Sequence, residues 1–190
     1  MAARKSKPVM HVALLRGINI GKAKRVPMAD LRALCEDLGY GDVQTLLNSG
    51  NVIFSAPRAD AKAAARIQKE IASQIGVSCR VVVITAAELD EIIAENPFVE
   101  HDTNPSLFQV TVLVNKADRS RVETLVKQDW GAERLGVGKH AAYVWCPNGS
   151  LESKPMIAIA KLLGDAVTSR NWATITKLHA LTRGSESARA

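Results

Sequence analysis

The sequence predicts an α+β protein built from two ferredoxin-like units, each a βαββαβ α/β plait with an antiparallel sheet, plus a connecting helix and a C-terminal helix. Three observations predict this fold. Short runs rich in β-branched residues alternate with segments whose apolar residues recur every three or four positions. The elements of the first part follow the order β-α-β-β-α-β, and the same order recurs after a connecting segment. The two halves share no residue-by-residue repeat, so element order alone supports the second unit.

The first unit begins with an apolar strand at Met10–Leu15, which runs into a loop rich in Gly and Lys. A helix follows at Met28–Leu38, because its apolar residues fall on one face and Gly39 suits a left-handed C-terminal position. The other expected elements are a strand at Asp42–Leu46, a turn at Asn48–Gly50, a strand at Asn51–Phe54, a helix capped by Asp60 and ended by Gly76, and a strand at Cys79–Ile84.

A capping-box pattern at Thr85–Glu88 opens the connecting helix, and Asn96–Pro97 ends it. The second unit is then expected to contain a strand at Leu107–Val114, a helix capped by Asp118, two strands flanking Gly138–Lys139, a helix carrying Met156 to Leu163, a strand at Ala166–Thr168 and a terminal helix capped by Asn171.

These elements divide the chain into five segments. The expected segments are 1–9 as a disordered basic tail, 10–84 as the first unit, 85–106 as the connecting helix and loop, 107–182 as the second unit with the C-terminal helix, and 183–190 as a disordered tail.

Composition narrows the class of protein. The apolar share of 47% is ordinary for a globular domain, and no apolar run approaches the length that crosses a bilayer. Three widely separated cysteines outside any C-x-x-C pair indicate buried reduced thiols, so we expect a cytoplasmic protein with no membrane partner. The net charge of +6 lies mostly on the two tails, which weakens a nucleic-acid interpretation.

Several kinds of chemistry lack their sequence signature. The four histidines have no metal-ligand spacing, and Gly136–Gly138 lacks the third glycine of a dinucleotide loop. No P-loop or G-x-S-x-G motif occurs, so we expect no metal and no cofactor. An RNA-recognition sheet would need aromatic residues on its first and third strands, where Phe54 is the only ring.

Two loops form the main candidate site. In a ferredoxin-like sheet the end of the first strand lies beside the start of the third, near the beginning of the first helix. This arrangement would bring a guanidinium, amides and permissive glycines together, with Lys24 and Arg25 adding charge, which suits a phosphate or carboxylate. The same residue types also form turns for conformational reasons alone, so a structural role stays open. The candidate ligand-binding residues of this site are Arg16, Gly17, Asn19, Gly21, Lys22, Asn48, Ser49, Gly50 and Asn51.

A second candidate lies at the start of the last helix, where Arg170, Asn171 and Trp172 follow one another. A guanidinium donor and an indole face would suit a further contact to an anion or a base. The alternative is structural, with a helix cap and a Trp that anchors the helix on the core.

The chain resembles the bacterial domain-of-unknown-function family numbered 1697. The residues that carry the resemblance are Leu14–Gly21, Met28, Leu31, Gly39, Ser49–Val52, Asn96–Phe98, Ser153–Lys154 and Arg170–Trp172. The resemblance implies a pair of α/β plait units and leaves the function open. Members of the family usually have a second glycine and a lysine around the first loop, where this chain has Lys22 and Pro27, and often Asn where Ala173 stands.

Three functions remain open at this stage, and the sequence does not decide whether the protein is an enzyme. The first is binding of a small anionic ligand by Arg16 with Asn19, Ser49 and Asn51. The second is phosphoryl hydrolysis by analogy with acylphosphatases, with Asn48 or Asn51 orienting water. The third is nucleic-acid or protein binding through the sheets and the basic tail. The sequence does not indicate the oligomeric state.

Overall fold

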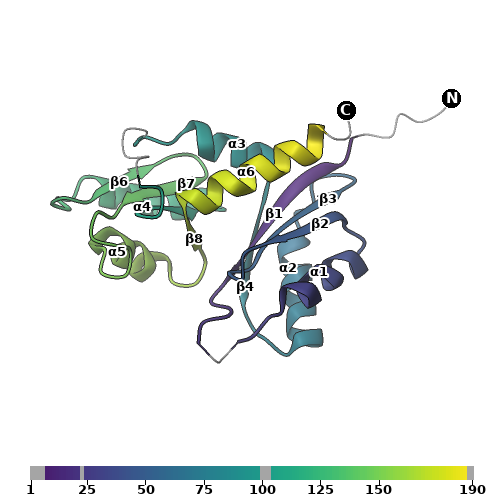
Figure 1. Cartoon of the computed structure of the whole chain (residues 1–190). Helices are drawn as coiled ribbons and strands as arrows, with labels where there is room; N and C mark the ends of the chain where they lie inside the picture. The colour runs from purple at the N-terminus through teal and green to yellow at the C-terminus, as the bar shows by residue number, and fades with distance from the viewer. Residues whose placement is uncertain (1–6, 22–23, 99–103, 188–190) are drawn as a thin grey trace. The chain divides into compact units, whose positions relative to one another are not determined.

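The computed structural model contains two four-stranded antiparallel sheets with helices packed on them (Figure 1). It describes residues 7–21, 24–98 and 104–187. Residues 1–86 together with 180–190 form one compact unit, and residues 87–179 form the other. The predicted α+β class with two ferredoxin-like units is confirmed. No helix in the described ranges is long and apolar enough to cross a membrane.

The first unit has the strand order β2-β3-β1-β4, with every neighbouring pair antiparallel. Leu14 on β1 lies directly opposite Asn51 on β3, so the end of one strand is beside the start of the other, as the sequence predicted. The elements of this unit are β1 (Val9–Arg16), α1 (Met28–Asp37), β2 (Gly41–Leu46), β3 (Asn51–Ala56), α2 (Ala63–Glu70), a π-helical turn (Ile71–Ile75) and β4 (Arg80–Thr85).

Both helices of the first unit pack on one face of its sheet. On this face of the sheet, β1 presents Ala13 and Leu15. Because side chains alternate across a strand, Leu14 and Arg16 point to the opposite face. The buried cluster between the sheet and the helices includes Val52, Phe54, Leu31, Leu34, Cys35, Ile67 and Ile71.

The second unit repeats the arrangement with the strand order β6-β7-β5-β8. Helices α4 and α5 pack on one face of the sheet, through Val122, Ile159 and Leu163. On the other face, the Tyr143 hydroxyl donates to the carbonyl of Ile92 at 2.8 Å. The elements of this unit are α3 (Ala86–Ala94), β5 (Phe108–Val112), α4 (Lys116–Val126), β6 (Arg134–Val137), β7 (Ala141–Trp145), α5 (Lys154–Leu163), β8 (Thr168–Asn171) and α6 (Trp172–Ser187), the last of which ends among residues grouped with the first unit.

Two of the predicted helix caps are wrong. Asn115, not Asp118, caps α4: its side-chain oxygen accepts from the Asp118 N–H at 2.8 Å, and its amide donates to the Asp118 carboxylate at 2.6 Å. The N-cap position of α2 is Lys62, so Asp60 lies too far before the helix to cap it. Its carboxylate accepts instead from the Lys62 N–H at 2.9 Å. Both errors arise because a short polar side chain satisfies whichever N–H its local turn presents.

The end of the chain also differs from the prediction. Strand β8 covers Thr168–Asn171, whereas Ala166–Thr168 was expected. Helix α6 runs on to Ser187, although a disordered tail was predicted from residue 183. Extending a helix that has already formed carries no nucleation cost, so a Ser- and Gly-containing stretch can continue it. Of the tails predicted at 1–9 and 183–190, residues 1–6 and 188–190 lie outside the described residues.

Candidate functional site

The loop after β1 and the turn before β3 meet in the first unit. The Asn19 side-chain amide donates to the carbonyl of Asn48 at 2.7 Å, and the Leu15 N–H donates to the carbonyl of Gly50 at 2.8 Å. These two bonds join segments that are about thirty residues apart in the chain. The structure therefore brings together the two loops that were predicted from the sequence to meet.

Asn19 holds this corner together. Its amide nitrogen donates to the carbonyls of Val26 and Asn48, and its oxygen accepts from the Val26 N–H at 2.8 Å. Its backbone adopts the left-handed conformation, with φ 56°, which Asn tolerates better than most residues. Both N–H groups of the side chain are thus used inside the protein. Asn19 positions the loop, and its amide donors are not left over for a ligand.

Ser49 and Asn51 also bond within the protein. Asn51 is fully buried, and its amide donates to the carbonyl of Leu46 at 2.7 Å and to the Ser49 hydroxyl at 3.0 Å. Asn51 faces Leu14, so its side chain lies on the sheet face away from α1 and α2. An Asn51 that oriented water for hydrolysis would have to break these bonds first.

The glycines of the two loops serve the backbone. Gly17 and Gly21 have φ of 69° and 61°, and a Cβ at either position would meet nothing within 4 Å. Gly50 combines a φ of 77° with close packing, because a Cβ there would lie 2.8 Å from Leu15 Cβ and 2.6 Å from Ile18 Cδ1. Gly50 is therefore required by packing as well as by conformation. Lys22, also predicted for this site, lies outside the described residues.

Arg16 points away from the α1 side of the corner. Since Leu15 packs in the core beneath the helices, the Arg16 side chain leaves the opposite face of the sheet. There it stands directly across from Arg80 on β4, a pairing of two cations on neighbouring strands. The predicted site residues thus separate into two groups: Arg16, Ser49 and Asn51 belong to one face, and Asn19 and Asn48 to the end of the sheet beside α1.

A small cavity opens at this second group. Its volume is about 290 Å³, and its lining consists of Asn19, Arg25, Val26, Pro27, Met28 and Asn48. The cavity lies against the first residues of α1, whose N-cap position is Pro27 with no capping side chain. The N–H groups at the start of a helix attract anions through their partial positive charge.

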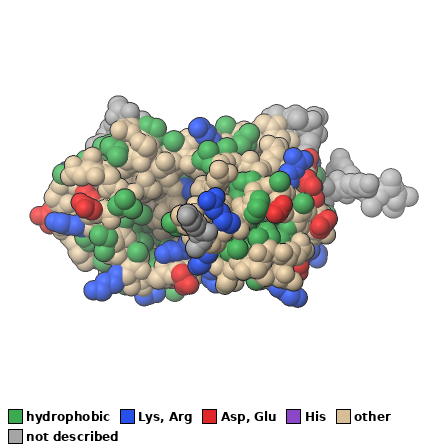
Figure 2. Space-filling view, turned by 60° about the horizontal axis from the view of Figure 1, so that its bottom comes forward, with side chains coloured by type: hydrophobic (Ala, Val, Ile, Leu, Met, Phe, Trp, Pro, Cys, Tyr) green, Lys and Arg blue, Asp and Glu red, His purple; other side chains and the backbone are tan. Residues whose placement is uncertain are grey.

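Two basic residues, Lys24 and Arg25, precede the start of α1 in the chain. Burial raises the pKa of the Cys79 thiol, and the positive charge of Lys24 partly offsets that rise. Figure 2 shows Lys and Arg side chains in blue on one face of the molecule. Arg25, which was predicted only to add positive charge to the loop, lines the cavity.

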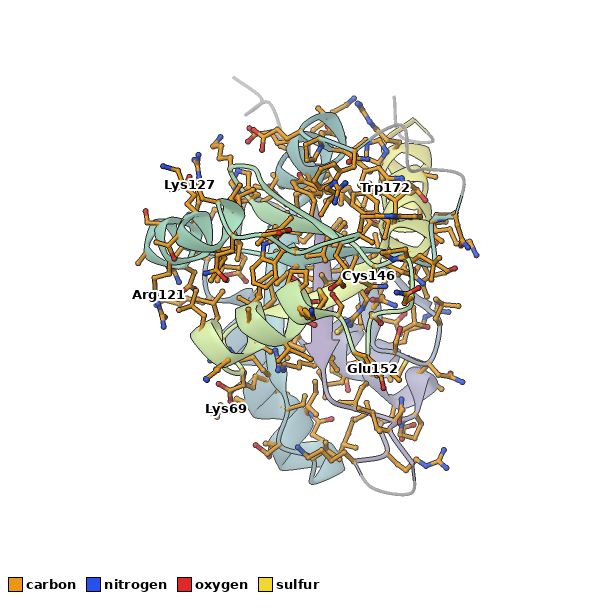
Figure 3. The ribbon with its side chains drawn as sticks, turned by 90° about the vertical axis from the view of Figure 1, so that its left-hand side faces the viewer. Lys69, Arg121, Lys127, Cys146, Glu152 and Trp172 are labelled. Atoms are coloured by element: carbon orange, nitrogen blue, oxygen red, sulfur yellow. The ribbon has the colours of Figure 1, made fainter. Side chains whose placement is uncertain are left out.

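The second candidate group lies in the other unit and is largely internal. Arg170 donates to the Thr168 hydroxyl at 3.0 Å and to the Ser169 carbonyl at 2.8 Å, and burial lowers the pKa of its guanidinium to about 10. Asn171 caps α6 as predicted, since its oxygen accepts from the Thr174 N–H at 2.9 Å. The Trp172 ring lies 5.3 Å from that of Phe108, and Trp172 is only 6% exposed. Figure 3 labels this residue among the side chains of its unit. Its indole packs as a core side chain.

In the parts of the chain that the structure describes, no three His, Cys, Asp or Glu side chains are arranged to hold a metal ion. The basic tail invoked for nucleic-acid binding contains Arg4 and Lys5, which fall outside those parts.

Comparison with known proteins supports the fold and the family resemblance. The family described as "Protein of unknown function (DUF1697)" matches residues 9–143. Among solved structures, the chain is similar to a conserved bacterial protein, SP0830 from Streptococcus pneumoniae, with a TM-score of 0.72 and 19% identity over 93% of this chain and 99% of that one. At this identity the likeness concerns the fold alone. No curated protein matches the chain.

Proposed function

Because the chain belongs to the DUF1697 family, whose members are described as of unknown function, we propose a function from its own residues: binding of a small anion in the cavity beside α1. The anion is a phosphate or a carboxylate. The observation that carries the proposal is a pair of side chains that line the same cavity. Neither the Arg25 guanidinium nor the Asn48 amide has a hydrogen-bond or ion-pair partner among the residues that the structure describes.

The corner contains the three kinds of group that an anion needs. Arg25 supplies a planar cation with several donors, and Asn48 supplies an amide whose position is fixed through its own backbone. The uncapped first turn of α1 supplies backbone N–H groups. No Asp or Glu belongs to the cavity lining, and Asp30, the acidic residue in the first turn of α1, lies outside that lining.

The size of the cavity restricts the ligand class. A volume of about 290 Å³ lies just below the range typical of small-molecule pockets, roughly 300–1,000 Å³. The cavity therefore suits inorganic phosphate, or the phosphate or carboxylate end of a small metabolite. In this proposal the cation that binds the anion is Arg25, whereas the sequence predicted Arg16.

The test is titration with inorganic phosphate, followed by backbone amide NMR shifts of residues 24–31 and 46–50. Wild type should show saturable shifts there, and Arg25→Ala should weaken binding by about tenfold or more, the value of one charged hydrogen bond. Asn48→Ala should weaken it as well. That variant leaves the fold of the corner unchanged, because Asn19 bonds the Asn48 carbonyl and not its side chain.

Lys69→Ala is the matched control, since it removes one exposed positive charge at the end of α2 without touching the cavity. If phosphate and small carboxylates cause no saturable shifts at this corner, or if Arg25→Ala behaves like Lys69→Ala, the proposed function is wrong.

A further inference from the structure

A second pocket opens at the opposite end of the first sheet, where β3 ends and α2 begins. Its volume is about 660 Å³, more than twice that of the corner cavity. The residues that line it come from the segment between α1 and β2, the end of β3, the following loop and α2. They are Leu38, Gly39, Tyr40, Ala56, Pro57, Arg58, Ala59, Asp60, Ala61, Lys62 and Arg66. None of them belongs to the candidate sites predicted from the sequence.

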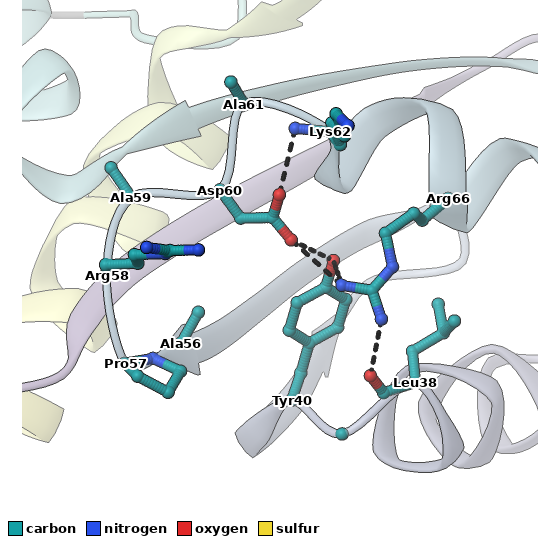
Figure 4. Close-up of a pocket in the computed structure, with 11 residues that line it drawn as sticks. Leu38, Tyr40, Ala56, Pro57, Arg58, Ala59, Asp60, Ala61, Lys62 and Arg66 are labelled. Carbon is teal, nitrogen blue, oxygen red and sulfur yellow. Dashed lines mark hydrogen bonds and ion pairs between the residues drawn. The ribbon is translucent and has the colours of Figure 1, made fainter.

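A hydrogen-bond network fixes one wall of this pocket (Figure 4). The Tyr40 hydroxyl donates to the Asp60 carboxylate at 2.9 Å, and Arg66 Nη1 lies 3.1 Å from the same carboxylate oxygen. Arg66 Nη2 donates to the carbonyl of Leu38 at 2.8 Å, and the guanidinium lies over the Tyr40 ring at 5.2 Å. The network continues inward, because the buried His11 ring accepts from the Asp60 N–H at 3.3 Å.

This network fixes the orientation of Arg66 but does not occupy all of its N–H donors. A guanidinium has five N–H donors. Arg66 gives one to Tyr40, one to Asp60 and one to Leu38, so two have no acceptor among the described residues. Asp60, in contrast, is fully engaged: its two oxygens accept from Tyr40, Arg66 and the Lys62 N–H. The carboxylate forms an ion pair with Arg66 and does not face the pocket as an open negative charge.

Two more cations complete the pocket. Arg58 extends from the loop after β3, in Figure 4 toward the side where Asp60 and Tyr40 lie. Neither its guanidinium nor the Lys62 ammonium has an ion-pair or hydrogen-bond partner in the described ranges of the chain. Three cations against one carboxylate give the lining a charge of +2. A phosphomonoester, with a charge of about −1.5 to −2 and three acceptor oxygens, complements such a lining.

The rest of the lining is apolar and supplies room for an organic body. Ala56, Pro57, Ala59, Ala61 and Leu38 form the uncharged part of the wall. The volume lies in the middle of the range typical of small-molecule pockets, about 300–1,000 Å³. We propose that this pocket binds a phosphomonoester with a nucleotide-sized organic body, whose phosphate is held by Arg58, Lys62 and the braced Arg66.

The test is NMR titration of the full chain with adenosine monophosphate, and with adenosine and inorganic phosphate as separate probes. We expect saturable shifts at the amides of residues 57–66 with the monophosphate, and weaker binding of each part alone. Arg58→Ala combined with Lys62→Ala should weaken monophosphate binding by about tenfold or more. Arg66 is left intact because its bonds to Tyr40 and Asp60 support the structure.

Two controls separate this site from the corner cavity. Lys69→Ala changes the charge of the same helix outside the pocket, and Arg25→Ala removes the corner cation; both should leave the 57–66 shifts unchanged. The inference is overturned if millimolar monophosphate gives no saturable shifts at 57–66, if adenosine binds as tightly as its monophosphate, or if the double variant binds like wild type. Each of these results leaves the phosphate titration of the corner unaffected.

Discussion

Replacing Asn19 tests how the first loop is held. Asn19→Ala removes three hydrogen bonds, at 2.7, 2.8 and 2.9 Å. At about 0.7 kcal/mol each, in the lower half of the usual range because the side chain is half-buried, they contribute about 2 kcal/mol. Alanine in the left-handed conformation adds about 1 kcal/mol, since Asn19 has φ 56°. Asn19→Ala should therefore destabilise the first unit by about 3 kcal/mol, and Asn19→Gly, which removes the backbone strain, by about 2 kcal/mol.

The assay has to report on the first unit alone. All three Trp residues, at positions 130, 145 and 172, lie in the second unit, so intrinsic fluorescence does not follow the first one. Amide hydrogen exchange of β1 and β3 does, with β5 as the internal reference. We expect exchange to accelerate about 100-fold for Asn19→Ala and about 30-fold for Asn19→Gly, with β5 unchanged. Wild-type protection in Asn19→Gly would show that conformation, not hydrogen bonding, is the whole contribution of Asn19.

Three other predictions concern stability. Gly50→Ala should cost about 2–4 kcal/mol by hydrogen exchange in β1 and β3, because it combines a φ of 77° with a Cβ 2.6 Å from Ile18, and a cost below about 1 kcal/mol would contradict this account. Tyr40→Phe should cost about 1 kcal/mol in the same assay, since Asp60 keeps its bonds to Arg66 and to the Lys62 N–H; an unchanged exchange rate would mean that the hydroxyl bond has no net value. Burial alone would raise the pKa of Asp60, but hydrogen bonds from Tyr40, the Lys62 N–H and Arg66 lower it overall from its ordinary 3.8. The ionised carboxylate thus stabilises the fold above the ordinary pKa, and this contribution is lost as the pH falls through the folded-state value. Between about pH 5 and about pH 3 the urea midpoint, followed by circular dichroism, should drop less in Asp60→Asn than in wild type, and equal drops would rule out this coupling.

Much of the fold follows from the sequence because its elements are separated clearly. Helical periodicity in Met28–Leu38 and the turn at Asn48–Gly50 leave few alternatives, and the β-α-β-β-α-β order then restricts the topology. From that topology the contact between the loop at Asn19 and the turn at Asn48 can be predicted, and the structure contains it.

The direction of Arg16 could not be predicted in the same way. The strand before it, Met10–Leu15, is apolar at nearly every position, so alternation does not reveal which face meets the helices. A register shift of one residue would place Arg16 on the other face of the sheet. Only the packing of Leu15 against the helices settles that Arg16 leaves the other face, and that Arg25 is the cation beside α1.

The second pocket was missed for a related reason. Tyr40 and Asp60 are twenty residues apart and Arg66 is further on, with no spacing that marks a motif. Their meeting depends on where β2 starts and how the loop after β3 returns, and element boundaries are the least certain part of a prediction from sequence.

The two pockets of the first unit share one structural origin. In a ferredoxin-like unit the two helices begin at opposite ends of the sheet, because β1 and β3 run in opposite directions and each leads into a helix. Each helix start is therefore exposed at its own end, with positive partial charge on its free N–H groups. In the described part of the first unit neither α1 nor α2 is capped by a side chain. The start of α1 lies by a cavity whose lining includes Arg25, and the start of α2 by a pocket whose lining includes three cations.

In the second unit, which has the same topology, the two corresponding helix starts are capped by side chains. Asn115 caps α4 by accepting from the Asp118 N–H, and Ser153 caps α5 by accepting from the Met156 N–H at 3.4 Å. Its helix starts are thus satisfied from within the chain, as stability alone would favour by about 1 kcal/mol per cap. If the basic loops of the first unit served only stability, a Ser or Asp at Pro27 or Lys62 would serve better. Pro27→Ser should then stabilise the unit and at the same time compete with phosphate for the start of α1. A Pro27→Ser variant that is more stable and binds phosphate as well as wild type would remove the helix start from the proposed site.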